Sequence, residues 1–456
     1  MTATATITIH PLKMITKNND ITTLCDNISV NHATGHLMFA GRDTVELAKR
    51  YGTPLYLIDE DHIRAMCRIY VNAMKEAFDE YSKPLFASKA LCFKKIYNIV
   101  ESEGVGTDVA SVGELFTALR ADFPPENIIF HGNNKTDDDI EFAIGQKVGC
   151  FVCDNREELE IIDKYAASLN VKQKILLRIT PGIDPHTHAK INTGRVDSKF
   201  GAAIETLQAE ELTMLALSLK NIELRGFHCH IGSQIFDYEP FADAAKIMIG
   251  FIADIKEKTG STARYLNLGG GMGVRYVESD PIIDYRSNIL SIGKIIKEEC
   301  KAHNITPPHI FMEPGRSIVA DAGMTLYTVG TVKRIPGYKN YVSVDGGMAD
   351  NPRFALYGSP YTVVMANKMT DGGESFVATV AGRCCESGDI IQEGVTLPEN
   401  TTRGDTLAVL TTGAYNYSMA SNYNRLPKPP MVMLEGGSDR IVIKGESFED
   451  VARYDV

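Results

Sequence analysis

Short apolar runs alternate with charged segments of helical spacing from about residue 84 onward. Runs rich in β-branched and aromatic residues predict buried strands, and apolar positions repeating every three or four residues predict helices. Segments 137–146 and 155–170 have this helical spacing. The predicted strands cover 84–90, 106–111, 127–132, 150–155, 174–179, 224–232, 265–270 and 309–315. Eight strand–helix repeats predict a TIM (β/α)8 barrel. The competing fold is a doubly wound open sheet, but the glycine fingerprint that binds dinucleotides is absent after the first strand.

The pattern changes after about residue 317, where β-rich runs are separated by Gly, Asn and Asp. This pattern predicts a second, all-β domain of the sandwich or barrel-like kind. Residues 27–45 are also β-like, and we expect their strands to join that domain. The predicted organisation is a flexible arm at 1–26, strands at 27–45, the barrel at 46–316 and the C-terminal β domain at 317–456.

Composition narrows the class of protein. A chain of 456 residues can hold two domains, and 44% hydrophobic with 23% charged residues is ordinary for a globular protein. The net charge of -11 argues against electrostatic binding of nucleic acid. No apolar run reaches the length of a membrane span, and the first residues lack the pattern of a secretory signal. Nine scattered cysteines predict reduced thiols in a cytoplasmic protein.

Candidate chemistry gathers where the predicted barrel strands end, which is where TIM barrels carry their active sites. Lys89 ends the first strand, and His228 and His230 end the sixth. The run "GGGMG" follows the seventh strand, and "EPGR", which begins with Glu313, follows the eighth. Lys89 stands among apolar residues, where an ammonium group is costly to desolvate.

These groups together indicate pyridoxal phosphate as the cofactor. Glycines allow backbone N–H groups to approach a phosphate, because no Cβ blocks the way. The cofactor aldehyde forms a Schiff base with a lysine amine, and a carboxylate pairs with its pyridinium nitrogen. A near-buried Lys89 would then be consumed in that bond. No metal is predicted, because the C-x-x-C of Cys150 and Cys153 has no second pair and fits a strand.

A series of motifs resembles one known family. In chain order they are "FASKA", "GTDVASVGEL", "HGNNK", "GFHCHIGSQ", "NLGGGMG", "EPGRS", "DGGMADNPRFALYG", "RCCESGD" and "GAYNYSMASNYN". Spanning about residues 50–440, they resemble the diaminopimelate decarboxylases, fold-type III pyridoxal-phosphate enzymes related to ornithine and arginine decarboxylases. "DPHTHAKINTGRVDSKFG", "CESGD" and "DNPRFALYG" favour the diaminopimelate branch. Leu91 departs from the pattern, since an Asn commonly follows the "KA" pair, and we expect a small adjustment beside the cofactor.

The resemblance implies a role for each matching residue. The implied catalytic residues are Lys89 in the Schiff base, His230 stacked on the cofactor ring, Glu313 on the pyridinium nitrogen and Cys385 as the acid that protonates the carbanion. The other implied cofactor contacts are Asp108, Ser233, Gly269, Gly270, Gly271, Pro314, Gly315, Arg316 and Tyr415. The implied substrate contacts are Arg316, Arg353 and Tyr357 for carboxylate, Glu386 for the distal ammonium, and Tyr415.

The implied activity is decarboxylation of meso-2,6-diaminopimelate to L-lysine and CO2. The implied assembly is a homodimer in which "CESGD" reaches the cofactor of the neighbouring subunit, with neither nucleic acid nor a membrane as partner. Three alternatives stay open: a decarboxylase of another basic amino acid, a non-catalytic binding homologue, and a metal-dependent TIM-barrel hydrolase with His228, His230 and Lys89 at its metal. The hydrolase leaves "GGGMG" and "EPGR" without a role.

Simpler structural roles are also predicted for some of these residues. His228 is expected to be a core histidine hydrogen-bonded to a neighbouring strand. Cys384 and Cys385 are expected to face opposite sides of a strand, with Cys384 buried, so that at most one thiol is catalytic.

Overall fold

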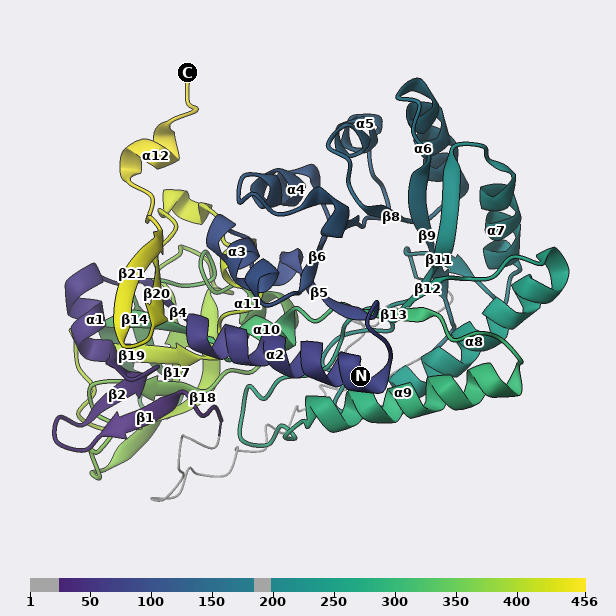
Figure 1. The fold of residues 1–456 in the computed structure, drawn as a ribbon. Helices are drawn as coiled ribbons and strands as arrows, with labels where there is room; N and C mark the ends of the chain where they lie inside the picture. Colours follow the sequence, from purple (N-terminus) through teal and green to yellow (C-terminus); the bar gives the residue numbers. More distant parts are fainter. Residues whose placement is uncertain (1–23, 184–197) are drawn as a thin grey trace, which may run out of the picture.

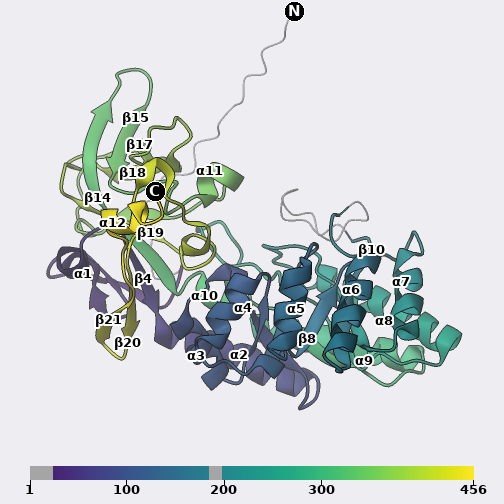
Figure 2. The same cartoon turned by 90° about the horizontal axis from the view of Figure 1, so that it is seen from above.

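The computed structural model describes residues 24–183 and 198–456 of the chain. These residues form a ring of strands and helices on one side and a mainly β region on the other (Figure 1, Figure 2). The predicted arm at 1–26 lies almost wholly outside the described residues, as does most of the "DPHTHAKINTGRVDSKFG" stretch. Within the described ranges, every helix is too short or too polar to cross a bilayer.

Eight parallel strands close into a barrel. They follow one another around the ring in chain order, and the last pairs with the first. The strands are β5 (Lys83–Ala87), β6 (Gly106–Val109), β7 (Ile128–Phe130), β8 (Cys150–Cys153), β9 (Gln173–Thr180), β11 (Ile222–His228), β12 (Tyr265–Asn267) and β13 (His309–Met312). A short strand, β10 (Ala202–Ala203), adds to β9. All eight overlap the predicted ranges, so the predicted barrel is confirmed.

Helices cover the outside of the barrel (Figure 1). They are α2 (Glu60–Ala77), α3 (Lys94–Ser102), α4 (Val112–Leu119), α5 (Asp137–Gly145), α6 (Arg156–Ser168), α7 (Gln208–Ser218), α8 (Glu239–Thr259) and α9 (Tyr285–Ala302). Side-chain caps fix where several begin: Asn155 accepts the Glu158 N–H at α6, and Thr136 forms a reciprocal capping box with Asp139 at α5. With helices outside and side chains filling the interior, the strands are buried on both faces, which explains their continuous apolar runs.

The second region is built on a mixed sheet with the order β18-β17-β15-β14-β4-β20-β21, to which β16 and β19 are joined. Its strands are β4 (Leu55–Asp59), β14 (Gly323–Arg334), β15 (Asn340–Val344), β16 (Val363–Met365), β17 (Ser375–Ala381), β18 (Ile390–Pro398), β19 (Thr406–Leu410), β20 (Met431–Glu435) and β21 (Ser438–Ile443). Strand β4 pairs with β14 and β20. The range 46–316 assigned to the barrel therefore also contributes one strand to this sheet.

The N-terminal β-like residues form their own three-stranded sheet beside this region. It contains β1 (Ile28–Asn31), β2 (His36–Phe39) and β3 (Arg42–Asp43), and α1 (Thr44–Tyr51) follows it. Leu37 and Phe39 pack with Leu326 and Leu434 in one apolar cluster, and the Leu37 N–H donates to the Ala366 carbonyl. The sheet thus stays separate in its strand pairing but shares the core of the β region.

The two regions meet at the mouth of the barrel. The helix α10 (Arg316–Val319) leads directly from β13 into β14. The Tyr415 N–H donates to the Ala90 carbonyl at 2.7 Å, and the Thr362 hydroxyl donates to the Tyr276 carbonyl at 2.9 Å. The helix α11 (Arg353–Tyr357) comes from the β region, whose chain ends in α12 (Phe448–Ala452). Side chains from both regions can therefore contribute to one site.

Candidate active site

Glu313 is the buried carboxylate at the centre of the barrel mouth. It follows β13 and is 8% exposed. Asn267 Nδ2 donates to its Oε1 at 2.6 Å, and His131 Nε2 lies 2.8 Å from the same oxygen. His228 Nε2 lies 3.2 Å from Oε2. Side chains from the ends of β7, β11 and β12 thus converge on one carboxylate.

The electrostatics of this centre favour an ionised Glu313. Burial opposes its ionisation, but His131 and His228 outweigh burial and hold the pKa of Glu313 well below its usual range. Burial lowers the pKa of His228 to about 4, so this ring is neutral near pH 7. Asp108 on β6 has its pKa raised well above the usual range by burial and then by Glu313. Of the two neighbouring carboxyl groups, Glu313 carries the charge.

Lys89 differs from the sequence-based expectation. Strand β5 ends at Ala87, and Lys89 lies in the short 3-10 turn Ser88–Ala90 with its side chain exposed. The expectation of a near-buried lysine is therefore wrong, because the strand ends two residues before it. Its charge still acts on the site: burial, then Lys89, lowers the pKa of His230 well below its usual range. Lys89 thus presents an amine at the rim close to His230.

The glycine run joins three loops at the barrel mouth. A Cβ on Gly270 would overlap the carbonyl oxygen of Glu313, and one on Gly271 would overlap that of Gly232. Gly269 has φ +68°, in the left-handed region. Among the described residues, the N–H groups of Gly270 and Gly271 donate to no protein acceptor. Close backbone packing therefore requires these glycines and leaves two amides for an anion.

The loop from Pro314 to Arg316 packs on the lysine turn. A Cβ on Gly315 would lie 2.8 Å from that of Ala87, and the Ala87 N–H donates to the Pro314 carbonyl at 3.1 Å. Ser233 accepts from Arg316 Nη2 at 2.9 Å. Ser233 and the loop at 314–316, both predicted to contact the phosphate, therefore lie together beside the turn that carries Lys89.

Two buried guanidinium groups stand next to this cradle. Arg316 and Arg353 are each 6% exposed, and each lies within cation–π distance of the rings of Tyr276 and Tyr415. Arg353 also donates to the Tyr361 hydroxyl at 2.8 Å. Within residues 24–183 and 198–456, neither guanidinium has a carboxylate at ion-pair distance. Two buried cations without a counter-charge form a site that favours anions.

Several residues of the site had no predicted role. Tyr276 accepts from Arg316 at 2.8 Å, and although burial would raise its pKa, the two guanidinium groups lower it. His131 and Asn267 contact Glu313, and Arg178 is buried at the end of β9. His131 and Asn267 stand in the motifs "HGNNK" and "NLGGGMG" at the ends of barrel strands, which was the available signal, whereas Tyr276 lies nine residues beyond β12. His228 is a buried, hydrogen-bonded histidine as expected, but its partner is Glu313 at the site itself.

The residues predicted to complete the site from the β region divide into two groups. Tyr415 and Arg353 lie with Arg316 at the barrel mouth, and Tyr357 ends α11, which Arg353 begins. Cys385 and Glu386 are exposed, whereas Cys384 is buried. The Cys385 N–H donates to Asn424 Oδ1 at 2.7 Å. Among the described residues, neither exposed side chain forms a hydrogen bond or ion pair with Lys89, His230 or Glu313.

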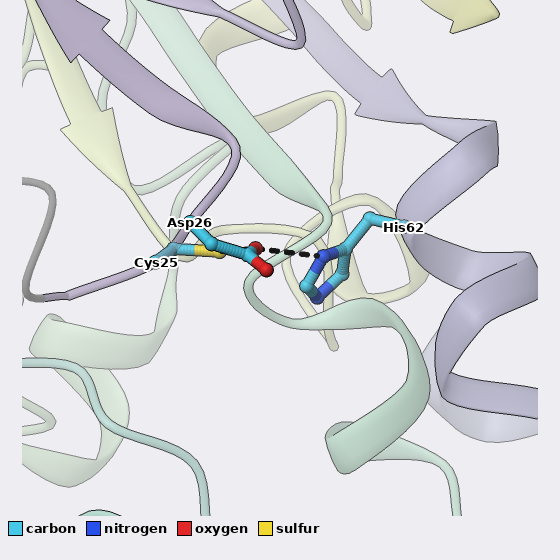
Figure 3. A group of neighbouring side chains, drawn as sticks. All are labelled: Cys25, Asp26 and His62. Atoms are coloured by element: carbon cyan, nitrogen blue, oxygen red, sulfur yellow. Dashed lines mark hydrogen bonds and ion pairs between the residues drawn. The ribbon is translucent and has the colours of Figure 1, made fainter. Parts of the chain in front are cut away.

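Two groups of potential metal ligands occur in the described part of the chain. His131, His228 and Glu313 are the cluster already described, in which the histidines bind the carboxylate. The other group is Cys25, Asp26 and His62, far from the barrel mouth in sequence and drawn in Figure 3. The Asp26 side chain is 90% exposed, and His62 Nε2 lies 3.2 Å from Asp321 Oδ1. This group is explained as an ion-pair cluster that ties α2 to the start of β1.

The residues at the barrel mouth fit pyridoxal phosphate. The two unpaired amides and the loop at 314–316 suit a phosphate, and an ionised, buried Glu313 suits a pyridinium nitrogen. Lys89 supplies an accessible amine at the same rim. The buried guanidinium groups suit the carboxylates of an amino-acid substrate.

Comparison with known proteins agrees with this geometry. Residues 62–320 match the family model described as pyridoxal-dependent decarboxylase, pyridoxal binding domain. The chain is 45% identical to the diaminopimelate decarboxylase of Bacillus methanolicus over 90% of this chain and 94% of that protein. Crystal structures of diaminopimelate decarboxylase from M. jannaschii and, complexed with L-lysine, from Helicobacter pylori give TM-scores of 0.87 and 0.81. Their identities are 32% and 33%, covering 94% and 90% of this chain and 98% of each of those chains.

The barrel, its mouth and the family match define a pyridoxal-dependent decarboxylase. Pyridoxal phosphate is the cofactor of this class. Within the class, the chain belongs to the diaminopimelate decarboxylase family. A metal-dependent hydrolase is not supported, because His228 bonds to Glu313 and the glycine run joins the loops of the cofactor site.

Proposed function

We propose that this chain removes one carboxylate from meso-2,6-diaminopimelate, giving L-lysine and CO2. The observation that carries the proposal is the pair of buried guanidinium groups, Arg316 and Arg353, beside the cofactor cradle. Within the part of the chain that the structure describes, neither has a carboxylate at ion-pair distance. A substrate with two carboxylates and two ammonium groups supplies the missing negative charge. The L-lysine bound in the Helicobacter pylori structure supports an amino acid of this length as a ligand.

Bound pyridoxal phosphate supplies an aldehyde for the substrate amine and a ring that accepts electrons when the carboxylate leaves. In our proposal Lys89 would hold the aldehyde between turnovers, and its amine would displace the product amine so that the product can leave. His230 covers one face of the ring and excludes water from it. Glu313 keeps the proton on the ring nitrogen, and Asp108 lies on the lysine side. Ser233 and the backbone of Gly269 to Gly271 and Pro314 to Arg316 bind the phosphate, with Tyr415 near it.

The substrate is held through its ends. Arg353 and Arg316 bind carboxylate, since a planar guanidinium makes two parallel hydrogen bonds to it. Tyr357, on α11 with Arg353, and Tyr415, between the two guanidinium groups, complete the carboxylate pocket. Glu386 binds the distal ammonium. This division distinguishes diaminopimelate from ornithine or arginine, which lack a distal carboxylate.

We further propose a homodimer in which Cys385 and Glu386 complete the site of the neighbouring subunit. Their exposure supports this arrangement, because both residues are accessible to a second subunit. Cys385 then delivers the proton to the α-carbon. The nine unpaired cysteines support a reducing, cytoplasmic location.

The decisive experiment is CO2 release from a panel of meso-diaminopimelate, ornithine, arginine and lysine by the holoenzyme. The proposal expects turnover of meso-diaminopimelate well above that of the other three. Preference for ornithine or arginine would contradict the substrate assignment while leaving the decarboxylase class intact.

A further inference from the structure

The Glu313 carboxylate is held through both of its oxygens. His228 Nε2 is hydrogen-bonded to Oε2 at 3.2 Å, and Asn267 donates to Oε1 at 2.6 Å. His131 Nε2 lies 2.8 Å from Oε1, at ion-pair distance but without hydrogen-bond geometry. The two imidazole rings pack edge to face with centroids 4.8 Å apart. The histidines come from β11 and from the residue after β7, so the closure of the barrel brings them to Glu313.

The His228 ring has no other polar contact that would explain its place. Its side chain is 1% exposed, and in the described part of the chain its Nδ1 has no hydrogen-bond partner. A buried acceptor without a donor is unfavourable for folding. Among the described residues, the one hydrogen bond of the His228 side chain is therefore the bond from Nε2 to Glu313.

We propose that His131 and His228 are positioning residues for Glu313, which fix its carboxylate through both oxygens and thereby keep the shared proton on the ring nitrogen of the bound cofactor. This inference rests on the proposed function only for its cofactor and not for its substrate. Neither histidine needs to touch the substrate.

The physical argument concerns one proton between two bases. A carboxylate and a pyridine nitrogen in contact share a single proton, which rests on the more basic partner. Each N–H donor to Glu313 makes the carboxylate less basic, so the proton stays on nitrogen. Removing the donors moves the proton to Glu313 and leaves a neutral ring that accepts electrons poorly.

Other charges around Glu313 do not replace the histidines. Asp108 is a second buried carboxyl and raises the proton affinity of Glu313 when ionised. Arg178 and Lys89 bear on the neighbouring groups, but no ion pair joins either to Glu313 within the described residues. The imidazoles, with Asn267, are the groups in contact with its two oxygens.

The test compares His228→Phe and His131→Phe with His228→Gln in holoenzyme loaded with cofactor labelled with 15N in its ring. Phe keeps a planar aromatic ring, larger than imidazole, and removes the donor, whereas the Gln amide can still donate. The expected 15N shift is that of a protonated ring in the wild type and in His228→Gln. Both Phe variants should move toward the neutral-pyridine value. The kcat should fall by about tenfold in His228→Phe, with little change in KM, as expected for one lost hydrogen bond to a charged group. It should also fall in His131→Phe, which loses the close contact with Oε1.

The matched control is His309→Phe, because His309 starts β13 at its other end and pairs with Asp79 at 3.0 Å. It should leave the 15N shift unchanged. Since Phe enters a fully buried position at 228, His131→Phe provides an independent removal of an imidazole that contacts Glu313. An unchanged 15N shift in a folded, cofactor-loaded Phe variant would overturn the proposal. If the wild type shows the 15N shift of a protonated ring but does not decarboxylate diaminopimelate, only the proposed substrate is overturned.

Discussion

The barrel mouth and the loop at 384–388 carry the two halves of the proposed chemistry in opposite environments. At the mouth, Glu313, Arg316 and Arg353 are buried and each makes side-chain hydrogen bonds. In the loop, Cys385 and Glu386 are exposed. A proton donor and a carboxylate meant to act in a dry site need a cover, and the described residues of this chain leave both exposed. This difference supports the proposal that a second chain supplies the cover.

The exposed loop nevertheless stands on a firm base. The buried Asp389 accepts from the Met348 and Cys384 N–H groups, each at 2.6 Å. Asp350 lies below, with its carboxylate accepting from the Tyr327 hydroxyl and from the Gly347 N–H. The hydrogen bonds of Asp389 anchor both ends of the exposed loop through a buried carboxylate.

The largest effect should come from removing the amine at the barrel mouth. Lys89→Ala is expected to lower turnover by roughly a thousandfold or more, which corresponds to a barrier increase of about 4 kcal/mol. The cofactor should still bind through its phosphate but lose the absorbance of its lysine-bound form. Lys83→Ala, at the other end of β5, is the control and should stay active. Normal turnover by Lys89→Ala would contradict the assignment of Lys89 as the residue that binds the cofactor aldehyde.

A smaller loss is expected from one guanidinium. Arg353→Met should raise KM for diaminopimelate by about ten- to a hundredfold, because a charge-assisted contact to a carboxylate is lost. Arg334→Met is the control, since Arg334 stacks on Phe376 and pairs with Glu399 away from the mouth. Steady-state kinetics on both variants decide the point. Equal KM values in the two variants would mean that the buried cations serve another purpose.

A third effect, which should leave turnover unchanged, concerns stability beneath the exposed loop. Burial raises the pKa of Asp350 to about 7, above its unfolded value near 4. The contribution of Asp350 to the free energy of unfolding is therefore complete below about pH 4 and is lost as pH rises through 7. The loss is at most about 4 kcal/mol. Asp350→Asn should flatten this part of the pH dependence in urea unfolding at pH 5 and 7. The exposed Asp371→Asn should follow the wild type, and a similar slope in all three proteins would contradict the assignment.

The sequence predicted the barrel well because each strand is a short apolar run ended by polar residues. It did not place β4, since the apolar run at Leu55–Asp59 adjoins α2 in the chain and only tertiary pairing moves it to the other sheet. The burial of Lys89 was misjudged because the residue at which β5 ends is a local detail. The contacts of His131 with Glu313 join residues far apart in sequence, so they depend on barrel closure and are invisible to local patterns.

The most direct test of the shared site is subunit mixing. Lys89→Ala and Cys385→Ala chains should each be nearly inactive alone. After exchange, about half of randomly formed two-fold dimers are mixed, and each mixed dimer has one intact site of two. Recovery of roughly a quarter of the wild-type activity is therefore the predicted result. If native mass spectrometry shows mixed dimers and no activity returns, Lys89 and Cys385 act within one chain and the account is contradicted.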